Sequence, residues 1–500
     1  MTTQAATSLF TFDNTYARDL EGFYVDWQAE EAKAPRVLAL NYELAEELGI
    51  PKDALESDNA LSVFAGNTPA VGAVNIAQAY AGHQFGGFSP SLGDGRALLL
   101  GEAIDTRGER RDIQLKGSGR TPFSRGGDGK AAVGPVLREY LLSEAMHALS
   151  IPTTRALAAV ATGELVFRET ALPGAILTRV AASHIRVGTF QYFAVRKEWP
   201  KIRQLADYVI KRHYPAAAGA DNPTLALFKA VLNAQARLVA QWMTVGFIHG
   251  VMNTDNMTIS GETIDYGPCA FMDRYDPATV FSSIDTQGRY AYGNQPAIAQ
   301  WNLARFAETL ITAVDEDQDR AIEQLTGILN GFPKVYVGHW LDLMRAKIGI
   351  VDQHDADLDL INDLFGALEG QNVDYTLFFR HLSSASAPDQ VDGTESLKSL
   401  FDDPSAIETW LPRWRERLAG SEDRSASDIE NRMNAVNPIY IPRNHKVEEA
   451  LAAAVQYDDL GPFRKLLAVL KSPFTEQDGC ESFAKPAPLD AAPYQTFCGT

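Results

Sequence analysis

Two oxygen-bearing side chains close together in the sequence could bind a divalent metal. Asn256 ends the segment "HGVMNTDN", and Asp265 lies nine residues later in "IDYG". An amide oxygen and a carboxylate that are brought together make a hard-oxygen site of the kind that Mg²⁺ or Mn²⁺ prefers. We expect "MTIS" and "ETID" to form short strands around Gly261 and to bring the two side chains together. Taken alone, Asn256 could instead be a turn residue, and Asp265 could instead be a residue that caps a helix.

A lysine and a glutamate upstream could bind the phosphates of a nucleotide. Lys116 lies near the end of a segment of alternating apolar and polar residues, 112–119, and Glu139 lies on a helix expected over 135–151. A lysine on a strand and a glutamate on the following helix can form an ion pair that aims the ammonium group at phosphates. Two alternatives stay open: both side chains are solvated, or Glu144 is the partner of Lys116.

A glycine-rich turn precedes this strand. The residues Gly93-Asp94-Gly95-Arg96 lead into an apolar segment over 96–105 that is expected to be a strand. Because glycine has no side chain, backbone N–H groups can approach a phosphate closely. Considered alone, the turn is an ordinary tight turn.

The elements that must position these residues fall into a β-rich part followed by a mostly helical part. A chain of 500 residues exceeds what one hydrophobic core supports, so two or three structural units are expected. We expect two lobes with a cleft between them. The expected elements are a helical region within 36–66, strands at 157–168 and 174–181, a long helix over 222–248, helices from about 296 onward and a loosely packed tail after 472.

Composition excludes several classes of function. A net charge of −19 argues against a general nucleic-acid or anionic-membrane binder, which needs clustered Lys and Arg. No apolar run approaches the roughly 18 residues of a membrane span. The segment Met1 to Arg18 lacks the pattern of a secretory signal, and three cysteines cannot make a disulfide framework. We therefore expect a cytoplasmic protein that binds neither nucleic acid nor membrane.

The combined pattern resembles the protein-kinase-like superfamily and, more narrowly, the selenoprotein O family (the bacterial YdiU group). The motifs that carry the resemblance are "TFDNTYARDL", "QLKGSGRTPFSRGGDG", "REYLLSEAMHALSIPTTRAL", "HGVMNTDN", "DYGP" and "NPIYIPRNH". The resemblance implies an α+β protein-kinase-like fold of two lobes. The implied parts are an N-terminal region (1–90), a β-rich N-lobe (91–190), a mostly helical C-lobe (191–310) and a helical C-terminal extension (311–500).

One position departs from ordinary kinases. A kinase loop places an aspartate two residues after the histidine as the proton acceptor, and here that position is Val251. An aspartate stands instead at Asp255, directly before Asn256. The selenoprotein O resemblance implies that ATP binds in reversed orientation and that AMP is transferred to Ser, Thr or Tyr hydroxyls of proteins. It also implies Asp255 as the proton acceptor and Asn256 with Asp265 as metal ligands.

The resemblance further implies a nucleotide site and protein substrates, whereas the sequence leaves the oligomeric state open, with a monomer favoured. Arg179 and Arg186 fall in "LTRVAASHIRVG", and a planar guanidinium suits phosphate oxygens. Without the resemblance the two arginines are equally surface residues, and Asp128 is equally a turn residue. The implied nucleotide-binding residues are Gly93, Gly95, Arg96, Lys116, Asp128, Gly129, Arg179, Arg186 and Asp265, with Glu139 in support.

A redox feature and a second nucleotide are also implied by the resemblance. Cys498 matches the C-terminal cysteine or selenocysteine of the family, and Cys269 follows "DYGP". A disulfide between them would hold the tail over the site, but it requires Cα atoms within about 7 Å. The alternative is that Cys269 is buried and that the Cys498 thiol lies in a frayed tail. UMP transfer with Mn²⁺ is allowed by the same resemblance.

Two other functions compete with adenylyl transfer. A small-molecule kinase shares the "HG…N" loop but keeps an acidic residue directly after it, where this chain has Val251. An inert nucleotide-binding scaffold has no need of metal ligands, so Asn256 and Asp265 argue against it.

Overall fold

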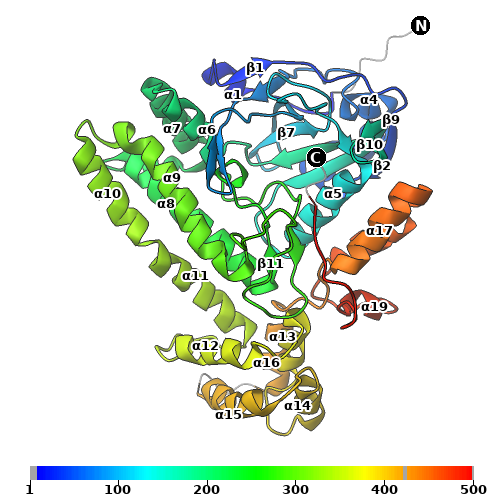
Figure 1. Cartoon of the computed structure of the whole chain (residues 1–500), viewed down its shortest axis with the longest axis vertical. Coiled ribbons are helices and arrows are strands. Elements are labelled where there is room, and N and C mark those ends of the chain that lie inside the picture. Colours follow the sequence, from blue (N-terminus) through cyan, green and yellow to red (C-terminus); the bar gives the residue numbers. More distant parts are fainter. Residues whose placement is uncertain (1–7, 421–424, 498–500) are drawn as a thin grey trace.

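The computed structural model describes residues 8–420 and 425–497. An antiparallel sheet occupies one end of the molecule, and helices form the rest (Figure 1). The strands of the main sheet are β1 (Tyr24–Asp26), β2 (Arg36–Leu40), β3 (Ile76–Gln78), β6 (Ala97–Ile104), β7 (Arg110–Lys116), β8 (Ala131–Ala132), β9 (Arg155–Phe167) and β10 (Ala171–Ala181). The remaining strands are β4 (Gly82–Gln84), β5 (Gly87–Ser89), β11 (Phe247–Ile248) and β12 (Ala270–Phe271).

Helices precede, cross and follow the sheet. The α-helices up to residue 245 are α1 (Thr15–Asp19), α2 (Tyr42–Glu47), α3 (Lys52–Leu55), α4 (Asp58–Phe64), α5 (Val133–Ala148), α6 (Val187–Val195), α7 (Trp199–His213) and α8 (Pro223–Val245). The later ones are α9 (Gln295–Val314), α10 (Gln318–Asn330), α11 (Phe332–Lys347), α12 (Asp357–Leu368), α13 (Tyr375–Ser383), α14 (Val391–Lys398), α15 (Ser405–Ala419), α16 (Ala426–Asn434), α17 (Asn444–Tyr457), α18 (Gly461–Leu470) and α19 (Glu481–Ala484). The 3₁₀ turns are η1 (Pro215–Gly219), η2 (Thr254–Asn256) and η3 (Tyr292–Asn294).

The main sheet places alternate residues of β7 and β10 on the same face. Its strand order is β1-β3-β6-β7-β10-β9-β2, with β8 paired to β10. Leu177 lies opposite Lys116, and Arg179 lies opposite Gln114. Because side chains alternate along a strand, these polar groups share one face, while their neighbours, such as Leu115, point to the other. The expected alternation over 112–119 is confirmed.

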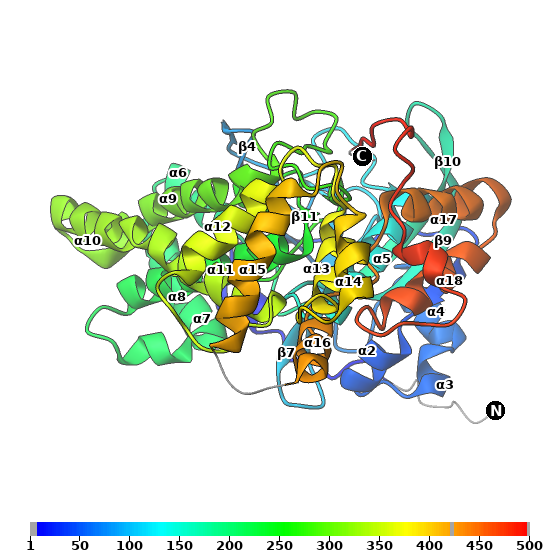
Figure 2. The same cartoon turned by 90° about the horizontal axis from the view of Figure 1, so that it is seen from below.

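Each face of the sheet has its own apolar core. Leu115 and its neighbours pack with α2, α3 and α4 on one side. On the other side, α5 lies against the sheet, and its outer face packs with α17 and α18 from the C-terminal region (Figure 2). Helix α5 is therefore enclosed between the sheet and the end of the chain.

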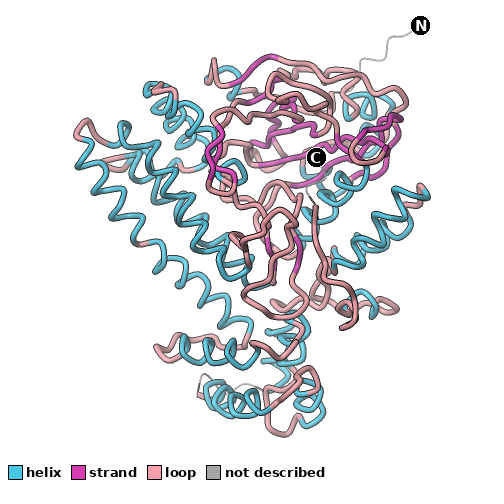
Figure 3. The backbone as a smooth tube through the Cα atoms, viewed as in Figure 1, coloured by secondary structure: helices cyan, strands magenta, loops and turns pink. Residues whose placement is uncertain are grey.

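The helical part is built around α8. Pro223 occupies the first turn, the Asn222 side chain accepts a hydrogen bond from the Leu225 N–H, and Gly246 ends the helix with φ +72°. Figure 3 shows helices filling this part of the molecule, with the long loops gathered between them and the sheet. The loop that carries Asp255 and Asp265 starts from this helix, so the main core fixes its entry point.

Two local predictions were wrong. Residues 36–40 form strand β2 rather than helix, because they pair with β9 at the edge of the sheet. The segments "MTIS" and "ETID" are not strands; they make only the isolated bridges Arg186↔Thr258 and Thr153↔Thr263. Most described residues of the tail after 472 are exposed, but Thr496 is buried and donates its hydroxyl hydrogen to the Pro268 carbonyl.

The α+β class is confirmed by the antiparallel sheet and the helices that follow it. The protein-kinase-like arrangement and the boundaries at 90, 190 and 310 stay predictions. Among the described residues, no helix combines the length and the apolar character that crossing a membrane requires.

Candidate active site

A cavity of about 1250 Å³ opens between the sheet, the long loops and the C-terminal segment. Its walls come from β6, β7 and β10, from α5, from the loop over 251–268, and from α17 with the tail. The predicted site residues that line it are Gly93, Gly95, Arg96, Lys116, Asp128, Gly129, Glu139, Arg179, Arg186, Asp255, Asn256 and Asp265. Residues from widely separated parts of the chain are thus brought to one cavity.

Lys116 forms the predicted ion pair with Glu139. Its Nζ lies 2.6 Å from Glu139 Oε2 and 2.5 Å from Asp265 Oδ1. Glu144, the competing partner, instead accepts hydrogen bonds from Nε and Nη2 of Arg155, both at 2.8 Å. Glu139 therefore supports the lysine, and Asp265 faces it from the loop.

Arg179 and Arg186 are buried at the site and not on the surface. Arg179 is 1% exposed, and its Nη1 lies 2.7 Å from Asp265 Oδ1 and 3.2 Å from Glu139 Oε1. It also donates to Gln114 Oε1, its neighbour across the strands. Arg186 Nη2 lies 3.8 Å from Asp265 Oδ2. Three cationic side chains therefore surround one carboxylate.

Asp265 is the centre of this charge cluster. Its backbone has φ +64°, a conformation that non-glycine residues rarely adopt and that is found mainly where the surroundings fix it. Burial acts to raise the pKa of its carboxyl group, but the charges of Lys116, Arg179 and Arg186 outweigh that effect and hold the pKa well below its usual range. Asp265 is thus ionised throughout the physiological pH range.

The surroundings of Asp255 shift the pKa of its carboxyl group in the opposite direction to that of Asp265. Burial raises the pKa of its carboxyl group to about 6. Its Oδ2 accepts a hydrogen bond from Gln84 Nε2 at 3.3 Å, whereas its Oδ1 is buried without a partner. A carboxylate with one unpaired oxygen and a pKa just below neutrality can accept a proton.

The residues present fit a divalent metal. Asn256 Nδ2 donates to the Val251 carbonyl at 3.0 Å, which leaves the amide oxygen as an acceptor. Asp265 Oδ2 has only the distant Arg186 contact, and Asp255 Oδ1 is unpaired. These are hard-oxygen donors of the type that Mg²⁺ and Mn²⁺ prefer. Across 8–420 and 425–497, no three His, Cys, Asp or Glu side chains gather as a metal cluster, so any such ion would retain water or phosphate ligands.

The predicted glycines lie where side chains cannot fit. Gly93 has φ +62°, and a Cβ there would overlap the ring of Phe123. Gly129 has φ +67°, and a Cβ there would overlap the Gly119 carbonyl. Asp128 is not free in the cavity, because its carboxylate pairs with Arg168 at 2.8 Å.

Several side chains of the site were not anticipated from the sequence. Tyr80 stacks beneath Arg186, with the guanidinium carbon 4.2 Å from the ring centroid. Asp94 is 1% exposed, and burial raises its pKa to about 6. Arg138 donates to the Cys269 carbonyl at 2.6 Å and contacts Tyr494 in the tail. Of these residues, only Asp94 could have been identified from the sequence as a candidate site residue, because it lies within the glycine-rich turn.

His249 anchors the loop. It is 1% exposed, its Nε2 lies 2.9 Å from the Ile264 carbonyl oxygen, and burial lowers its pKa. Cys269 is buried beside the same loop. Cys498 lies outside the described residues, so the predicted disulfide stays a prediction.

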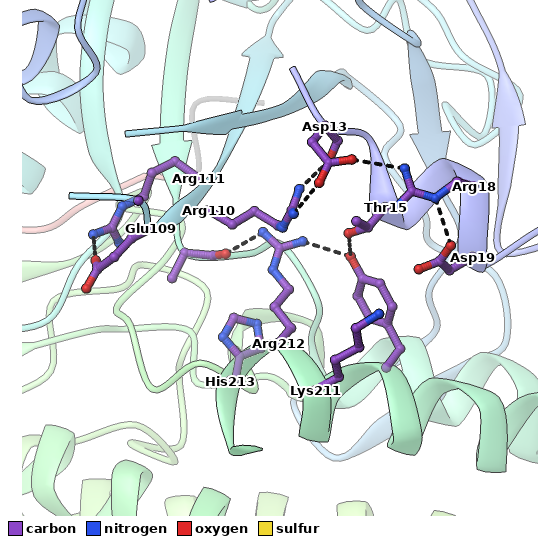
Figure 4. A pocket seen from close by; sticks show the side chains of 13 residues that line it. Asp13, Thr15, Arg18, Asp19, Glu109, Arg110, Arg111, Lys211, Arg212 and His213 are labelled. Carbon is purple, nitrogen blue, oxygen red and sulfur yellow. Dashed lines mark hydrogen bonds and ion pairs between the residues drawn. The ribbon is translucent and has the colours of Figure 1, made fainter. Parts of the chain in front are cut away.

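A smaller cavity of about 520 Å³ lies away from these residues (Figure 4). Asp13 lies there between Arg18 and Arg110 and is within 2.9 Å and 2.6 Å of them. Arg212 is buried beside it and paired with Glu102 at 2.7 Å. Carboxylates already neutralise these arginines, and none of the predicted site residues lines this cavity.

Comparisons with known proteins found one matching family and a set of similar proteins. The family model described as "Protein adenylyltransferase SelO" matches residues 7–471. A "Protein nucleotidyltransferase YdiU" of Cereibacter sphaeroides (strain KD131 / KCTC 12085) is 62% identical over 494 residues, which cover 98% of this chain and 100% of that protein. Proteins of the same name are 56% identical over 489 residues in Rhizobium rhizogenes (98% and 97% covered) and over 491 residues in Rhizobium meliloti (98% and 99% covered).

Proposed function

The chain belongs to the family of the protein adenylyltransferase SelO and is a nucleotidyltransferase, and from this premise we propose that it transfers AMP from ATP to Ser, Thr or Tyr hydroxyls of proteins. In this reaction the acceptor oxygen attacks the α-phosphorus of ATP, the bond to the bridging oxygen of the β-phosphate breaks, and pyrophosphate leaves. The hydroxyl proton passes to a base of the enzyme.

One observation carries the proposal. Lys116, Arg179 and Arg186 converge on the carboxylate of Asp265 in one cavity that Asp255 also lines. Glu139 also pairs with Lys116 and Arg179, and Asp94 lies 4.0 Å from Arg186, so the three cations act as charged hydrogen-bond donors held in place by carboxylates. Donors of this kind suit the oxygens of a triphosphate. Guanidinium groups also match the geometry of phosphate oxygens.

Asp255 acts as the proton acceptor. Its position directly before Asn256 places it on the same 3₁₀ turn as the proposed metal ligand. The position of the usual kinase base is Val251, an apolar residue that cannot take a proton. With a pKa of about 6, Asp255 is mostly ionised at neutral pH and yet basic enough to assist the attack.

Asn256 and Asp265 would hold Mg²⁺ or Mn²⁺ in the cavity. Such an ion, when bound, neutralises phosphate charge in the transition state. The surrounding residues contribute independently of it: Glu139 keeps Lys116 directed into the cavity, and the buried Gln114 fixes Arg179. We further propose that the sheet and the helices after it correspond to the N-lobe and C-lobe of a kinase-like fold, with ATP reversed relative to kinases.

Mass spectrometry of candidate acceptor proteins incubated with ATP and metal tests the proposal. We expect an AMP-sized mass increase, whereas a phosphate-sized increase would identify a kinase and contradict it. UTP in place of ATP tests UMP transfer in the same assay. Asp265→Ala is expected to abolish metal-dependent ATP binding in a titration, and an unchanged affinity would contradict the assigned metal site.

A further inference from the structure

A small hairpin forms part of the rim of the cavity, and the proposed chemistry does not use it. Strands β4 and β5 are joined by Phe85 and Gly86, which have φ +50° and +85°. Two positive φ angles in a two-residue connection define a type I′ turn, in which a bulky residue such as phenylalanine is unfavourable. The Phe85 N–H compensates by donating to Asn253 Oδ1 at 3.1 Å, so the loop before Asp255 holds the turn in place.

The inner strand of the hairpin contacts the proposed base directly. Gln84 Nε2 donates to Asp255 Oδ2, and a Cβ at Gly82 would overlap the Asp255 carboxylate. The His83 N–H donates to Thr254 Oγ1 at 2.7 Å. Gln84 also lines the large cavity. The hairpin is therefore fixed against the residue that would receive the acceptor's proton.

The outer strand has an open edge. The register pairs Gln84 with Gly87 and His83 with Phe88. In a two-residue hairpin the closing pair exchanges hydrogen bonds, so the next pair directs its N–H and C=O groups outward. His83 uses its outward N–H on Thr254, but in the described part of the chain the backbone of Phe88 has no such partner. Phe88 is also 40% exposed, so its edge is accessible for another strand.

Positive charge flanks this edge in an acidic protein. The Arg289 guanidinium carbon lies 4.7 Å from the ring centroid of Trp301, and its Nε is buried without a hydrogen-bond partner. Across 8–420 and 425–497, no carboxylate forms an ion pair with Arg289, whereas Arg305 on the other side of Trp301 pairs with Glu308 at 2.7 Å. A Cβ at Gly86 would lie 3.8 Å from the Arg289 guanidinium carbon, and the ring of His83 lies 5.3 Å from that of Trp301, so both cations are near the hairpin.

We propose that the hairpin is the docking site for the acceptor protein: an extended segment pairs with the edge of β5 at Phe88 and directs an acidic side chain to Arg289. This proposal rests on the proposed function, because it explains how the acceptor hydroxyl is brought to Asp255. Pairing with an exposed edge uses backbone groups and so accepts many sequences, while the arginine selects for acidic neighbours.

Two variants separate the two contacts. Phe88→Pro removes the outward N–H without disturbing the ladder, since proline is tolerated where the N–H faces outward, and Phe88→Ala keeps that N–H. Arg289→Gln removes the charge on a different element. Matched controls are Tyr457→Ala, an exposed aromatic residue on α17, and Lys229→Gln, an exposed cation on α8.

The assay measures AMP transfer to short synthetic peptides with one Ser, Thr or Tyr. The peptides form two series, one with Asp or Glu beside the hydroxyl and one with Asn or Gln there. We expect Phe88→Pro to lower kcat/KM about fivefold relative to Phe88→Ala on both series, as for loss of one hydrogen bond. We expect Arg289→Gln to abolish the preference of the wild type for the acidic series, and both variants to bind an ATP analogue normally.

The outcomes distinguish the docking site from the proposed function. If the wild-type protein binds the ATP analogue but transfers AMP to no peptide and no protein, the proposed function fails and the docking site with it. If the wild type transfers AMP and both variants match their controls, the docking site alone is refuted. Because Arg289 and Phe88 lie on separate elements, misfolding of the proline variant leaves the Arg289 result to decide.

Discussion

Replacing Asp255 by asparagine should stabilise the protein at neutral pH while abolishing its activity. The ordinary pKa of an aspartate, 3.8, is raised to about 6 in the folded chain because the carboxyl group is buried. A group with a raised folded pKa destabilises the fold once it ionises, so stability is lost as the pH rises from 3.8 through about 6. A shift of about two pKa units corresponds to about 3 kcal/mol between the two limits. Asparagine cannot ionise and avoids this cost.

Urea unfolding of wild type and Asp255→Asn over a range of pH measures the effect. The stability advantage of the variant should be larger at about pH 8 than at about pH 5, because roughly half of the total falls in that interval. The control is Asp389→Asn, which removes an exposed aspartate and should show no such trend. AMP transfer should be lost only in the Asp255 variant.

Either of two results would refute this reasoning. A stability difference that does not increase with pH would show that Asp255 is not a desolvated carboxyl group. Transfer that survives in Asp255→Asn at about pH 8 would show that another group takes the proton.

Four further outcomes are expected. The rate of AMP transfer should fall as the pH drops below about 6, since protonated Asp255 cannot act as a base; a profile that stays flat down to about pH 5 would count against it. Lys116→Ala should weaken ATP binding at least about tenfold by calorimetry, because a phosphate-facing cation is lost, whereas Lys229→Ala should not. Removal of metal with a chelator should stop transfer, and added Mg²⁺ or Mn²⁺ should restore it. Arg443→Met should cost about 3–5 kcal/mol in unfolding free energy, since it leaves the buried Asp374 unpaired; a loss under about 1 kcal/mol would contradict this.

The sequence predicted which residues meet in the cavity better than it predicted the local backbone. Lys116 and Glu139 could be paired because strand alternation and helix spacing are regular and local. Asn256 and Asp265 line one cavity, but an irregular loop brings them there and not the expected hairpin. Isolated bridges to Thr153 and Arg186, which are distant in the sequence, hold that loop, and no short-range pattern encodes them.

The remaining errors share a physical cause. Residues 36–40 read as the start of a helix, but pairing with β9 outweighs a weak local preference. Tyr80 acquires its role by stacking on Arg186, and Arg138 by reaching the Cys269 carbonyl. Such contacts depend on tertiary structure, so residue type and spacing did not reveal them.

The enclosure of α5 by the last helices has a consequence for how the protein is made. Leu451 and Val455 on α17, together with Thr496, line the same cavity as Lys116, although the ribosome adds them several hundred residues later. A nascent chain that lacks these residues therefore carries an incomplete pocket. The wall of the cavity is completed only after Lys116, Asp255 and Asp265 have already been synthesised.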